Sequence, residues 1–496
     1  MDLYEVTYLY KGVKYTNKSF VLDIIYKKSD DTITLDLLPK DKIEIVSCRI
    51  NLEDKMHNTD LFFSNGYQSW TDTQEQHVGQ KTKKMGFLDR FVEKTYHLRA
   101  YGDYDFIEYH HHYSFSYTYL RNKEQFRLYG SLSERSGYTV FYISKTSHLF
   151  AYKDNKGLII DSPYQAFNIF FTKGNERDVF DKYCLKFNKG FNKPPKLVGY
   201  TSWYRHYQNI SQEVIEKDLH DAIEKKLPFK LFQIDDGYQE SIGDWLLIDK
   251  KKFPLGLEPI AKKIKDNNMM PGLWLAPFCG SKNSTLFKNH PDWFIKNEKG
   301  EYIYQGANWD GTYVLDFHLK EVKDYLHEVF TTLKGYGFKL FKLDFLYAVT
   351  LKIHKDETRG QLMQEAMDFL RKELEGCYII GCGVPLFPAF FNVDYCRIGM
   401  DISLKWDDVF YMRFLHRERI SSKLTVRNTR YRAHLNNRFF KNDPDVFLLK
   451  GTQMSEEQKR FILETDRKYA DMFLTSDDMS LYTEEDIKLL NELAKE

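Results

Sequence analysis

A short apolar run, Lys339-Leu340-Phe341-Lys342-Leu343-Asp344-Phe345, contains ionisable side chains at its centre and near its end. This pattern indicates a buried strand that ends at a polar pocket, and it is the most informative stretch for the fold. Because side chains alternate along a strand, Lys342 and Asp344 share one face. A buried strand carries two such groups on one face where that face opens into a polar pocket. Ile234-Asp235-Asp236-Gly237 and Arg397-Ile398-Gly399-Met400-Asp401 repeat the pattern elsewhere in the chain. We therefore expect three strands that end at one pocket.

The second part of the chain, residues 191–496, alternates short apolar runs with amphipathic segments rich in Lys and Glu. This order predicts parallel strands joined by helices, and no glycine-rich phosphate fingerprint follows any run. A (β/α)₈ barrel, whose strands all end at one face, is therefore favoured over a doubly wound sheet. The expected strands are Leu197–Ser202, Lys230–Ile234, Pro271–Pro277, Lys339–Phe345, Tyr378–Gly381, Tyr395–Gly399 and Val446–Leu449, with one more near 424–429, and the expected helices include Ser211–Lys226, Leu319–Lys334 and Arg359–Glu375.

The first part, residues 1–190, has short runs of β-branched and aromatic residues, such as Thr32–Leu37 and Tyr113–Tyr119, separated by turn sequences. Apolar and polar residues alternate along these runs, which predicts strands with one buried face in an antiparallel β-sandwich. Lys193-Pro194-Pro195 marks the boundary, since proline continues neither a helix nor a strand ladder. We predict a sandwich domain over residues 1–190 and a barrel over residues 191–496.

Composition excludes several classes of partner. The 496 residues include 72 Lys and Arg and 71 Asp and Glu, so no net charge draws the protein to nucleic acid or to an anionic membrane. Six cysteines are scattered without paired spacing and are interpreted as reduced thiols. The sequence has neither a secretion signal nor a run of roughly 18 apolar residues, which leads us to expect a cytoplasmic location and no membrane partner.

Clustered carboxylates beside basic groups are typical of glycosidic bond cleavage, which needs one ionised and one protonated carboxyl group. We expect Lys342 to keep Asp344 ionised as a nucleophile, and partial burial to let Asp401 hold a proton. Metal-dependent hydrolysis is the alternative use of such acids, but no histidine pair with ligand spacing lies near them. His110-His111-His112 is expected on the surface of a sandwich strand, and Asp443-Pro444-Asp445 in a loop. We therefore predict no metal site.

At these residues the sequence resembles glycoside hydrolase family 36, the α-galactosidases of the melibiase clan. The resemblance covers most of the chain and rests on a series of motifs in a fixed order. They are Asn65-Gly66-Tyr67-Gln68-Ser69-Trp70, Ser202-Trp203-Tyr204, Asp235-Asp236-Gly237-Tyr238-Gln239, Gly243-Asp244-Trp245, Lys252-Phe253-Pro254, Pro271-Gly272-Leu273-Trp274-Leu275-Ala276-Pro277, Lys342-Leu343-Asp344, Gly381-Cys382-Gly383 and Arg397 with Asp401.

The resemblance implies an N-terminal β-supersandwich followed by a (β/α)₈ barrel, and a retaining, exo-acting α-galactosidase that needs no cofactor. It implies a substrate with a terminal α-linked galactose on an oligosaccharide or glycoconjugate, and a possible homo-oligomer. The implied roles are Asp344 as nucleophile, Asp401 as general acid and base, Asp235 and Asp236 as acceptors for O4 and O6, Lys342 and Arg397 as contacts to ring hydroxyls, Trp274, Trp203 and Cys382 as pocket lining, and Trp70 as a residue that closes the pocket, in some members across a subunit boundary.

Alternatives stay open at this point. An α-N-acetylgalactosaminidase differs in the room at C2, a galactosyltransferase of the raffinose-synthase type differs in its acceptor site, and a carbohydrate-binding protein without catalysis forms a third class. The chain departs from many family members at Ala276 and in 308–314, which lacks an arginine, so subsite contacts are not determined. It also ends soon after the expected helix Glu484–Lys495, and a C-terminal β-domain common in the family is expected to be absent.

Overall fold

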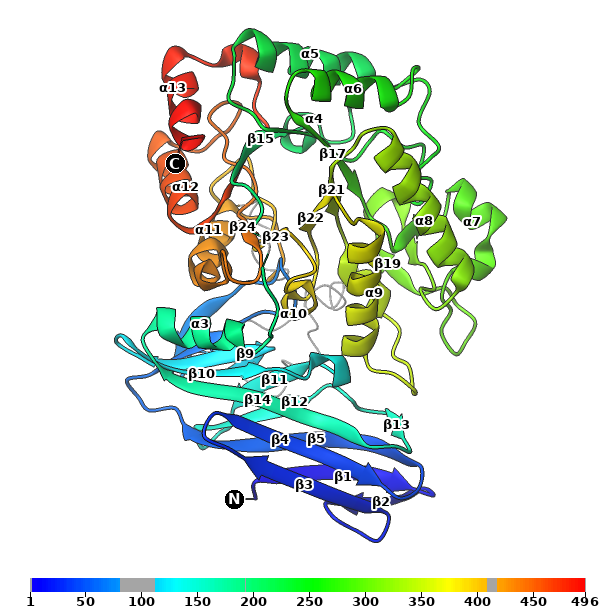
Figure 1. Ribbon diagram of the computed structural model, residues 1–496, viewed down its shortest axis with the longest axis vertical. Helices are drawn as coiled ribbons and strands as arrows, with labels where there is room; N and C mark the ends of the chain where they lie inside the picture. Colours follow the sequence, from blue (N-terminus) through cyan, green and yellow to red (C-terminus); the bar gives the residue numbers. More distant parts are fainter. Residues whose placement is uncertain (1, 81–111, 192, 408–416, 496) are drawn as a thin grey trace.

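Two antiparallel sheets and a parallel barrel lie next to each other along the long axis of the molecule (Figure 1). This computed structural model describes residues 2–80, 112–191, 193–407 and 417–495. The fold class predicted from the sequence, a β-sandwich followed by a (β/α)₈ barrel, is confirmed. The predicted boundary between residues 190 and 191 falls after helix α3 (Glu176–Leu185) and before the first barrel strand, β15 (Leu197–Thr201).

Over the described residues 2–80 and 112–191, the N-terminal sandwich consists of two seven-stranded sheets. Along β4 (Thr32–Pro39), Ile33, Leu35 and Leu37 are buried and the residues between them are partly exposed, as the alternation in the sequence predicts. One sheet has the order β2 (Val13–Thr16), β1 (Tyr4–Tyr10), β5 (Ile43–Lys55), β12 (His148–Lys153), β11 (Thr139–Ile143) and β8 (Tyr113–Phe115), with β13 (Ile159–Ile160) paired to β5. The other has the order β3 (Leu22–Lys28), β4, β14 (Tyr164–Gly174), β10 (Gln125–Ser131), β9 (Tyr117–Asn122), β6 (Leu61–Ser64) and β7 (Gln74–His77).

The segment Tyr113–Tyr119 differs from the prediction of one strand with one buried face. It forms two strands, β8 and β9, that belong to different sheets, and Ser116 between them has a positive φ of 66°. Both faces are buried because this part of the sandwich packs against the barrel, and its aromatic rings share one cluster with barrel residues. His112 is also buried, with Nε2 2.9 Å from the carbonyl oxygen of His77, so its predicted surface position is wrong. His110 and His111 lie outside the described residues.

In the part of the barrel that the structure describes there are eight parallel strands, and a parallel bridge from Val446, just after the last but one strand, to Leu474 links the two edges. Its strands are β15, β16 (Leu231–Ile234), β17 (Met270–Leu275), β21 (Leu340–Leu343), β22 (Tyr378–Gly381), β23 (Tyr395–Arg397), β24 (Lys441–Asp443) and β25 (Met472–Thr475). A small sheet of β18 (Cys279–Ser281), β19 (Tyr304–Gly306) and β20 (Thr312–Val314) follows β17. The helices are α4 (Trp203–His206), α5 (Gln212–Glu224), α6 (Glu258–Asp266), α7 (Thr285–Asn289), α8 (Lys320–Gly335), α9 (Arg359–Glu373), α10 (Leu386–Ala389), α11 (Ser422–Tyr431), α12 (Glu456–Tyr469) and α13 (Glu484–Leu493).

Two of the predicted barrel strands are wrong. The segment 424–429 belongs to helix α11, where the Ser421 side chain caps the backbone N–H of Leu424. Thr425 and Thr429, which made the segment resemble a strand, each donate their hydroxyl to the carbonyl four residues earlier. The last two strands are instead β24 and β25, and Val446–Leu449 forms no strand beyond the single bridge at Val446. The three predicted helices correspond to α5, α8 and α9.

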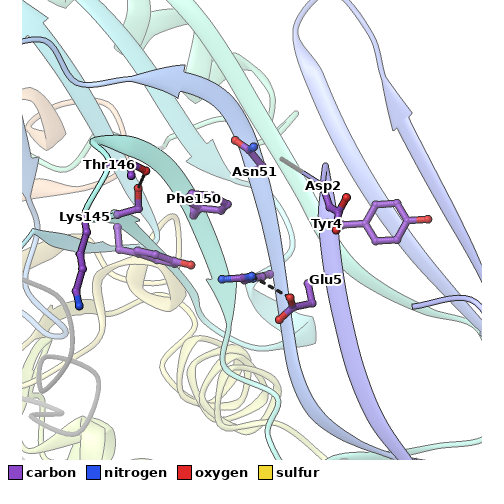
Figure 2. Close-up of a pocket in the computed structure, with 10 residues that line it drawn as sticks. Asp2, Tyr4, Glu5, Asn51, Lys145, Thr146 and Phe150 are labelled. Carbon is purple, nitrogen blue, oxygen red and sulfur yellow. Dashed lines mark hydrogen bonds and ion pairs between the residues drawn. The ribbon is translucent and has the colours of Figure 1, made fainter. Parts of the chain in front are cut away.

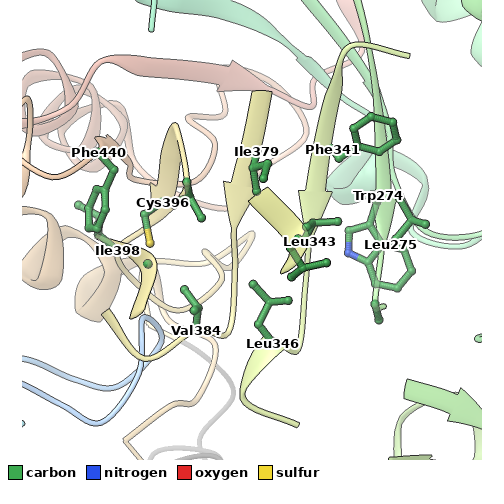
Figure 3. Packing of buried hydrophobic residues seen from close by; sticks show 14 of the residues in the cluster. Trp274, Leu275, Phe341, Leu343, Leu346, Ile379, Val384, Cys396, Ile398 and Phe440 are labelled. Carbon is green, nitrogen blue, oxygen red and sulfur yellow. The ribbon is translucent and has the colours of Figure 1, made fainter. Parts of the chain in front are cut away.

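Strand β21 shows how the barrel places a charged pair at its mouth. Phe341 and Leu343 point outward into the core beneath the helices (Figure 3), where Phe341 packs against Phe330 of α8. Leu340 points inward and joins an interior layer with residues of the neighbouring strands. Because side chains alternate, Lys342 lies one layer above Leu340 on the inner face. The polar pocket therefore has an apolar floor formed by the same strands.

The loop after β6, which contains the motif Asn65-Gly66-Tyr67-Gln68-Ser69-Trp70, connects the sandwich to the barrel through hydrogen bonds. Arg432, fully buried, donates hydrogen bonds to the carbonyl oxygens of Gln68 and Ile398 at 3.1 and 2.9 Å, and also to that of Ser69. Burial lowers the pKa of Arg432 to about 10. The backbone N–H of Ser69 donates to the carbonyl of Val384 at 2.9 Å. This loop is therefore held against the barrel face by hydrogen bonds. Among the described residues, no helix combines the length and apolarity that spanning a bilayer requires.

Candidate active site

Asp344 is placed at the barrel mouth by the end of β21. Its Oδ2 accepts a hydrogen bond from Trp274 Nε1 at 3.1 Å, and its Oδ1 accepts one from the backbone N–H of Phe345 at 2.8 Å. Phe345 has a positive φ of 53°, which turns the chain sharply after the strand. The carboxylate is 8% exposed. These contacts fix its orientation and leave one edge for a ligand.

The charge on Asp344 is controlled by burial more than by Lys342. Burial raises the pKa of Asp344, while the Lys342 ammonium and the Trp274 N–H oppose that rise without cancelling it. Lys342 instead forms an ion pair with Asp235, with 3.0 Å between Nζ and Oδ2. The expectation that Lys342 would hold the pKa of Asp344 down is therefore wrong in its net effect. Burial favours a neutral Lys342, but the surrounding acidic groups, with Asp235 first and Asp344 next, together outweigh it and raise the pKa of that lysine.

Asp235 is surrounded by protein donors. Its Oδ2 accepts from Lys342, from Gln233 Nε2 at 2.8 Å and from Thr201 Oγ1 at 3.3 Å, and its Oδ1 accepts from the backbone N–H of Asp236 at 3.0 Å. A carboxylate offers about four acceptor positions. The protein itself therefore uses the acceptor capacity of Asp235, and the ion pair spans the inside of the barrel from β16 to β21.

Asp236 keeps spare capacity. It accepts from Gln208 Nε2 at 2.7 Å, from Trp309 Nε1 at 2.7 Å and from Gln239 Nε2 at 2.6 Å, and no cation pairs with it among the described residues. Burial raises the pKa of Asp236, and these three hydrogen bonds reduce the rise. Three donors for about four acceptor positions leave one position for a hydroxyl group of a ligand.

Arg397 organises the acids on the other side of the mouth. Its guanidinium binds Asp401 Oδ1 at 2.9 Å, Asp443 Oδ2 at 3.2 Å and Asp445 Oδ1 at 2.9 Å. Asp443 ends strand β24, so the prediction of a loop for Asp443-Pro444-Asp445 missed two contacts of the site. Tyr204 donates its hydroxyl to Asp445. Burial raises the pKa of Asp445 to about 7, against the charge of Arg397 and together with the charges of the other two acids.

Trp70 reaches the site from the sandwich within the same chain. Its Nε1 donates to Cys382 Sγ at 3.2 Å, and its ring contacts Phe345 edge-on at 5.1 Å between centroids. Gly383 has a positive φ of 57°, and a Cβ there would lie 2.9 Å from the Trp70 ring. The glycine of the Gly381-Cys382-Gly383 motif is therefore required both for the turn and for the close approach of Trp70.

The structure thus brings most of the predicted residues together. Trp274 donates to Asp344, Lys342 pairs with Asp235, and Arg397 pairs with Asp401. Trp203 lies on α4, packs against the interior layer of the barrel and contacts Tyr207, so its contact with a ligand stays a prediction.

Trp309 is a further residue of the site that the sequence analysis missed. It lies in the small sheet region after β17, has a positive φ of 54° and contacts the rings of Trp274 and Phe345 at 5.9 and 5.1 Å. It occurs in the 308–314 stretch noted for its missing arginine. In this chain an indole N–H binds Asp236 from that stretch. The available signal was an aromatic residue beside Asp310-Gly311, a turn sequence.

A second hollow, of about 500 Å³, lies on the sandwich and contains none of the predicted residues (Figure 2). Arg49 on its lining forms an ion pair with Glu5, the residue opposite on the neighbouring strand, at 2.9 Å. The rings of Tyr142 and Phe150 are stacked on each other, and these residues are only 7% and 8% exposed. The hollow therefore offers little aromatic surface on which a sugar could stack.

Comparison with known proteins supports the interpretation of the barrel mouth. The melibiase family model matches residues 181–368, which span β15 to β21 and include Asp235, Asp236, Trp274 and Asp344. The resemblance to glycoside hydrolase family 36 is confirmed. The curated relatives include the α-galactosidase AgaA of Geobacillus stearothermophilus, 30% identical over 163 residues, which are 31% of this chain and 21% of that protein. Mel36A, an α-galactosidase of Lactobacillus acidophilus, is 33% identical over 141 residues, 27% of this chain and 18% of that protein.

The family-36 likeness extends to whole-chain structure. The α-galactosidase TtGalA of Thermus thermophilus, solved with p-nitrophenyl α-D-galactopyranoside, superposes with a TM-score of 0.76 at 23% identity over 98% of this chain and 93% of that one. AgaA superposes with a TM-score of 0.64 at 12% identity over 99% of this chain and 68% of that one. These structures share the fold. The matched segments of the curated relatives span about one fifth of their length.

Proposed function

We propose that the protein is a retaining, exo-acting α-galactosidase that removes terminal α-linked galactose from oligosaccharides or glycoconjugates. The observation that carries the proposal is the arrangement around Asp344, a buried carboxylate fixed by Trp274 with Asp401 held by Arg397 at the same mouth. The electrostatic influence of Asp401 on Asp344 supports their facing a common space. The curated relatives are α-galactosidases, which supports the substrate class.

In the first step, an Asp344 carboxylate oxygen attacks C1 of the galactose ring and forms a covalent bond to it. The bond between C1 and the glycosidic oxygen breaks, and Asp401 gives its proton to that oxygen as the aglycone leaves. The hydrogen bonds from Trp274 and Phe345 orient the attacking carboxylate, which lowers the entropic cost of reaching this geometry.

In the second step, Asp401 takes a proton from water, the water oxygen bonds to C1, and the bond from C1 to Asp344 breaks. Two displacements restore the α configuration of the released galactose. The acid role requires a proton on Asp401 at the start of the cycle. One guanidinium, Arg397, faces three carboxylates, so a single positive charge is shared among three acids.

Asp236 is the best-supported acceptor for a sugar hydroxyl. Asp235 and Asp236 were predicted together as acceptors for O4 and O6, and Asp236 has the unused acceptor position. Asp235 then serves to hold Lys342 in place, and the ammonium has three hydrogens of which Asp235 uses one. Lys342 can therefore donate to a ring hydroxyl, as predicted.

Two enzyme alternatives have the same catalytic pair. An α-N-acetylgalactosaminidase would need room for the acetamido group at C2, and a galactosyltransferase would need a sugar hydroxyl in place of water in the second step. A binding protein without catalysis is disfavoured, because both carboxylates are present with partners that orient them. No observation favours any of these over the α-galactosidase.

Purified protein should be assayed with nitrophenyl α-galactoside, α-N-acetylgalactosaminide and α-glucoside, and the first product anomer followed by NMR. We expect turnover of the galactoside to exceed the others greatly, with α-galactose formed first. Preference for the acetamido substrate would replace the proposal with its nearest alternative. β-Galactose as the first product would overturn the assignment of nucleophile and acid.

A further inference from the structure

Two loops at the barrel mouth carry a second cluster of ionisable side chains. Asp316 and His318 lie in the loop before α8, and His354 and Glu357 lie in the loop before α9. One ligand atom each from His318, His354 and Glu357 lies within 4.8 Å of the other two. None of these residues is hydrogen-bonded or ion-paired to Asp344 in the described part of the chain. The cluster is therefore separate from the reacting carboxylates.

His318 is oriented as metal-binding histidines usually are. Its Nδ1 lies 3.0 Å from Asp316 Oδ1, and its Nε2 faces the carboxylate of Glu357. A carboxylate behind Nδ1 fixes the ring and keeps the hydrogen on that nitrogen, and a metal ion bound at Nε2 would displace the hydrogen that Nε2 shares with Glu357. Asp316 would then act behind the ligand, with Nε2 of His318 and a Glu357 oxygen as the first two ligand atoms.

His354 provides the third ligand atom. Its Nδ1 lies 3.9 Å from Glu357 Oε1, beyond a hydrogen bond, and its ring centre lies 4.8 Å from that of His318. Its other nitrogen, Nε2, is buried without a hydrogen-bond partner among the described residues. A buried imidazole without hydrogen bonds is costly. The nitrogen nearer Glu357 is Nδ1, so a cation would relieve this cost only after the ring turns Nε2 towards it.

We propose that His318, His354 and Glu357 bind a divalent transition-metal ion of the zinc class. Two imidazole nitrogens and one carboxylate are a common zinc donor set, with one position left for water, and they are poorly suited to Mg²⁺ or Ca²⁺, which prefer oxygen ligands. Tetrahedral bonds of 2.0–2.1 Å place ligand atoms roughly 3.3 Å apart. Binding therefore requires these side chains, which lie in loops, to close from a spacing of up to 4.8 Å to that value.

The position of the cluster gives the ion a bracing role. The loop that carries His354 and Glu357 follows β21 and η5 (Leu346–Thr350), so it continues directly from the strand that ends at Asp344. The same loop contacts the sandwich, where the backbone N–H of Ile159 donates to the carbonyl of Lys355 at 2.7 Å. An ion bound here would fasten the two barrel loops to each other beside the contact with the sandwich, and would stabilise the folded chain.

The test uses the whole chain, treated with EDTA and dialysed, and titrated with ZnCl₂ by calorimetry. We expect one Zn²⁺ per chain and a rise in melting temperature, with MgCl₂ giving neither. CoCl₂ should give the visible absorption bands of nitrogen-coordinated Co²⁺. His354→Ala and Glu357→Gln should abolish binding, and Asp316→Asn should weaken it by roughly 10- to 100-fold, the usual effect of removing a carboxylate that orients a histidine ligand.

His220→Ala is the matched control. His220 also faces a carboxylate, with 3.7 Å between Nε2 and Glu224 Oε2, but it is 71% exposed on a helix and belongs to no such cluster among the described residues. The control should bind Zn²⁺ as the wild type does. Glu357→Gln keeps the size of the side chain, and its melting temperature in EDTA checks folding. Absence of Zn²⁺ binding in the wild type, or equal affinity in the wild type and His354→Ala, would overturn the proposal.

Discussion

Asp235 and Asp236 are adjacent carboxylates with different surroundings. We predict that replacing Asp235 by asparagine mainly lowers stability, and that replacing Asp236 mainly lowers kcat/KM. Asp235 is paired with the buried Lys342, whereas Asp236 accepts only neutral donors among the described residues. Asp235→Asn therefore tests a structural role, and Asp236→Asn tests ligand recognition. Asparagine preserves the size of both side chains, so that charge is the main change.

In Asp235→Asn, Lys342 loses the carboxylate with which it pairs at 3.0 Å. An unpaired buried charge left by removing one partner costs about 3–5 kcal/mol. The barrel should lose about that much free energy of unfolding, and activity should fall because Lys342 is no longer held in place. The loss should be greatest near neutral pH, where the lysine is charged.

In Asp236→Asn, the new side chain can keep its oxygen towards Gln208 and Trp309 and turn its amide towards Gln239. The Gln239 amide can rotate to present its oxygen, so all three hydrogen bonds to residue 236 are retained, and only the long 3.3 Å bond from the Gly237 N–H to Gln239 Oε1 is lost. Melting temperature should change little. The ligand loses a hydrogen bond to a charged acceptor, worth about 1.5–3 kcal/mol, and kcat/KM for the α-galactoside should fall roughly 10- to 150-fold.

Thermal and urea unfolding should be measured beside kcat/KM for nitrophenyl α-galactoside and α-glucoside. The reasoning predicts that Asp235→Asn is the less stable variant and that Asp236→Asn is the folded variant with reduced preference for galactose. A stable Asp235→Asn together with an Asp236→Asn of unchanged kcat/KM would refute it.

Three other variants test single features of the site. Burial raises the pKa of Asp344 above 3.8, so protonation of Asp344 favours the folded state. That contribution to stability is lost as the pH rises through the raised pKa. Asp344→Asn should therefore abolish turnover yet raise the melting temperature at pH 7 relative to the wild type. Trp309→Phe keeps an aromatic ring at this position but removes the 2.7 Å hydrogen bond to Asp236. This variant should lower kcat/KM by roughly 10-fold in steady-state assays. Gly383→Ala should displace Trp70 and lower both activity and melting temperature. The control Gly300→Ala, at a φ of 80° with no neighbour within 4 Å, should cost only the roughly 1–2 kcal/mol of backbone strain. Equal losses in both variants would contradict the close approach of Trp70.

The strand-end acids could be predicted from the sequence because a short local pattern determines them. Asp344 follows an apolar run whose period of two fixes its face, and the same is true of Asp235. The partner of Lys342 could not be predicted in this way. Lys342 and Asp344 share a face, but the ammonium reaches Asp235 on another strand across the barrel interior. That choice depends on how the strands are staggered around the barrel, which no local pattern contains.

Contacts made by loops were missed for a similar reason. The hydrogen bond from Trp309 to Asp236 requires a left-handed backbone at a non-glycine residue, which composition does not indicate. Asp443 and Asp445 face Arg397 because β24 lies beside β23, whereas the sequence predicted a strand a few residues later, at Val446–Leu449. His318 and His354 come from loops on either side of α8 and β21, and their spacing in the chain resembles no metal-binding motif.

The central claim is that Asp344 is the nucleophile of a retaining α-galactosidase, and chemical rescue of Asp344→Ala tests it most directly. The variant should not turn over nitrophenyl α-galactoside, because no group can form the bond to C1. Azide can occupy the space of the missing carboxylate, attack C1 from the same side and restore some activity. The account predicts β-galactosyl azide as the product, identified by NMR. Undiminished activity of the purified variant without azide would contradict it.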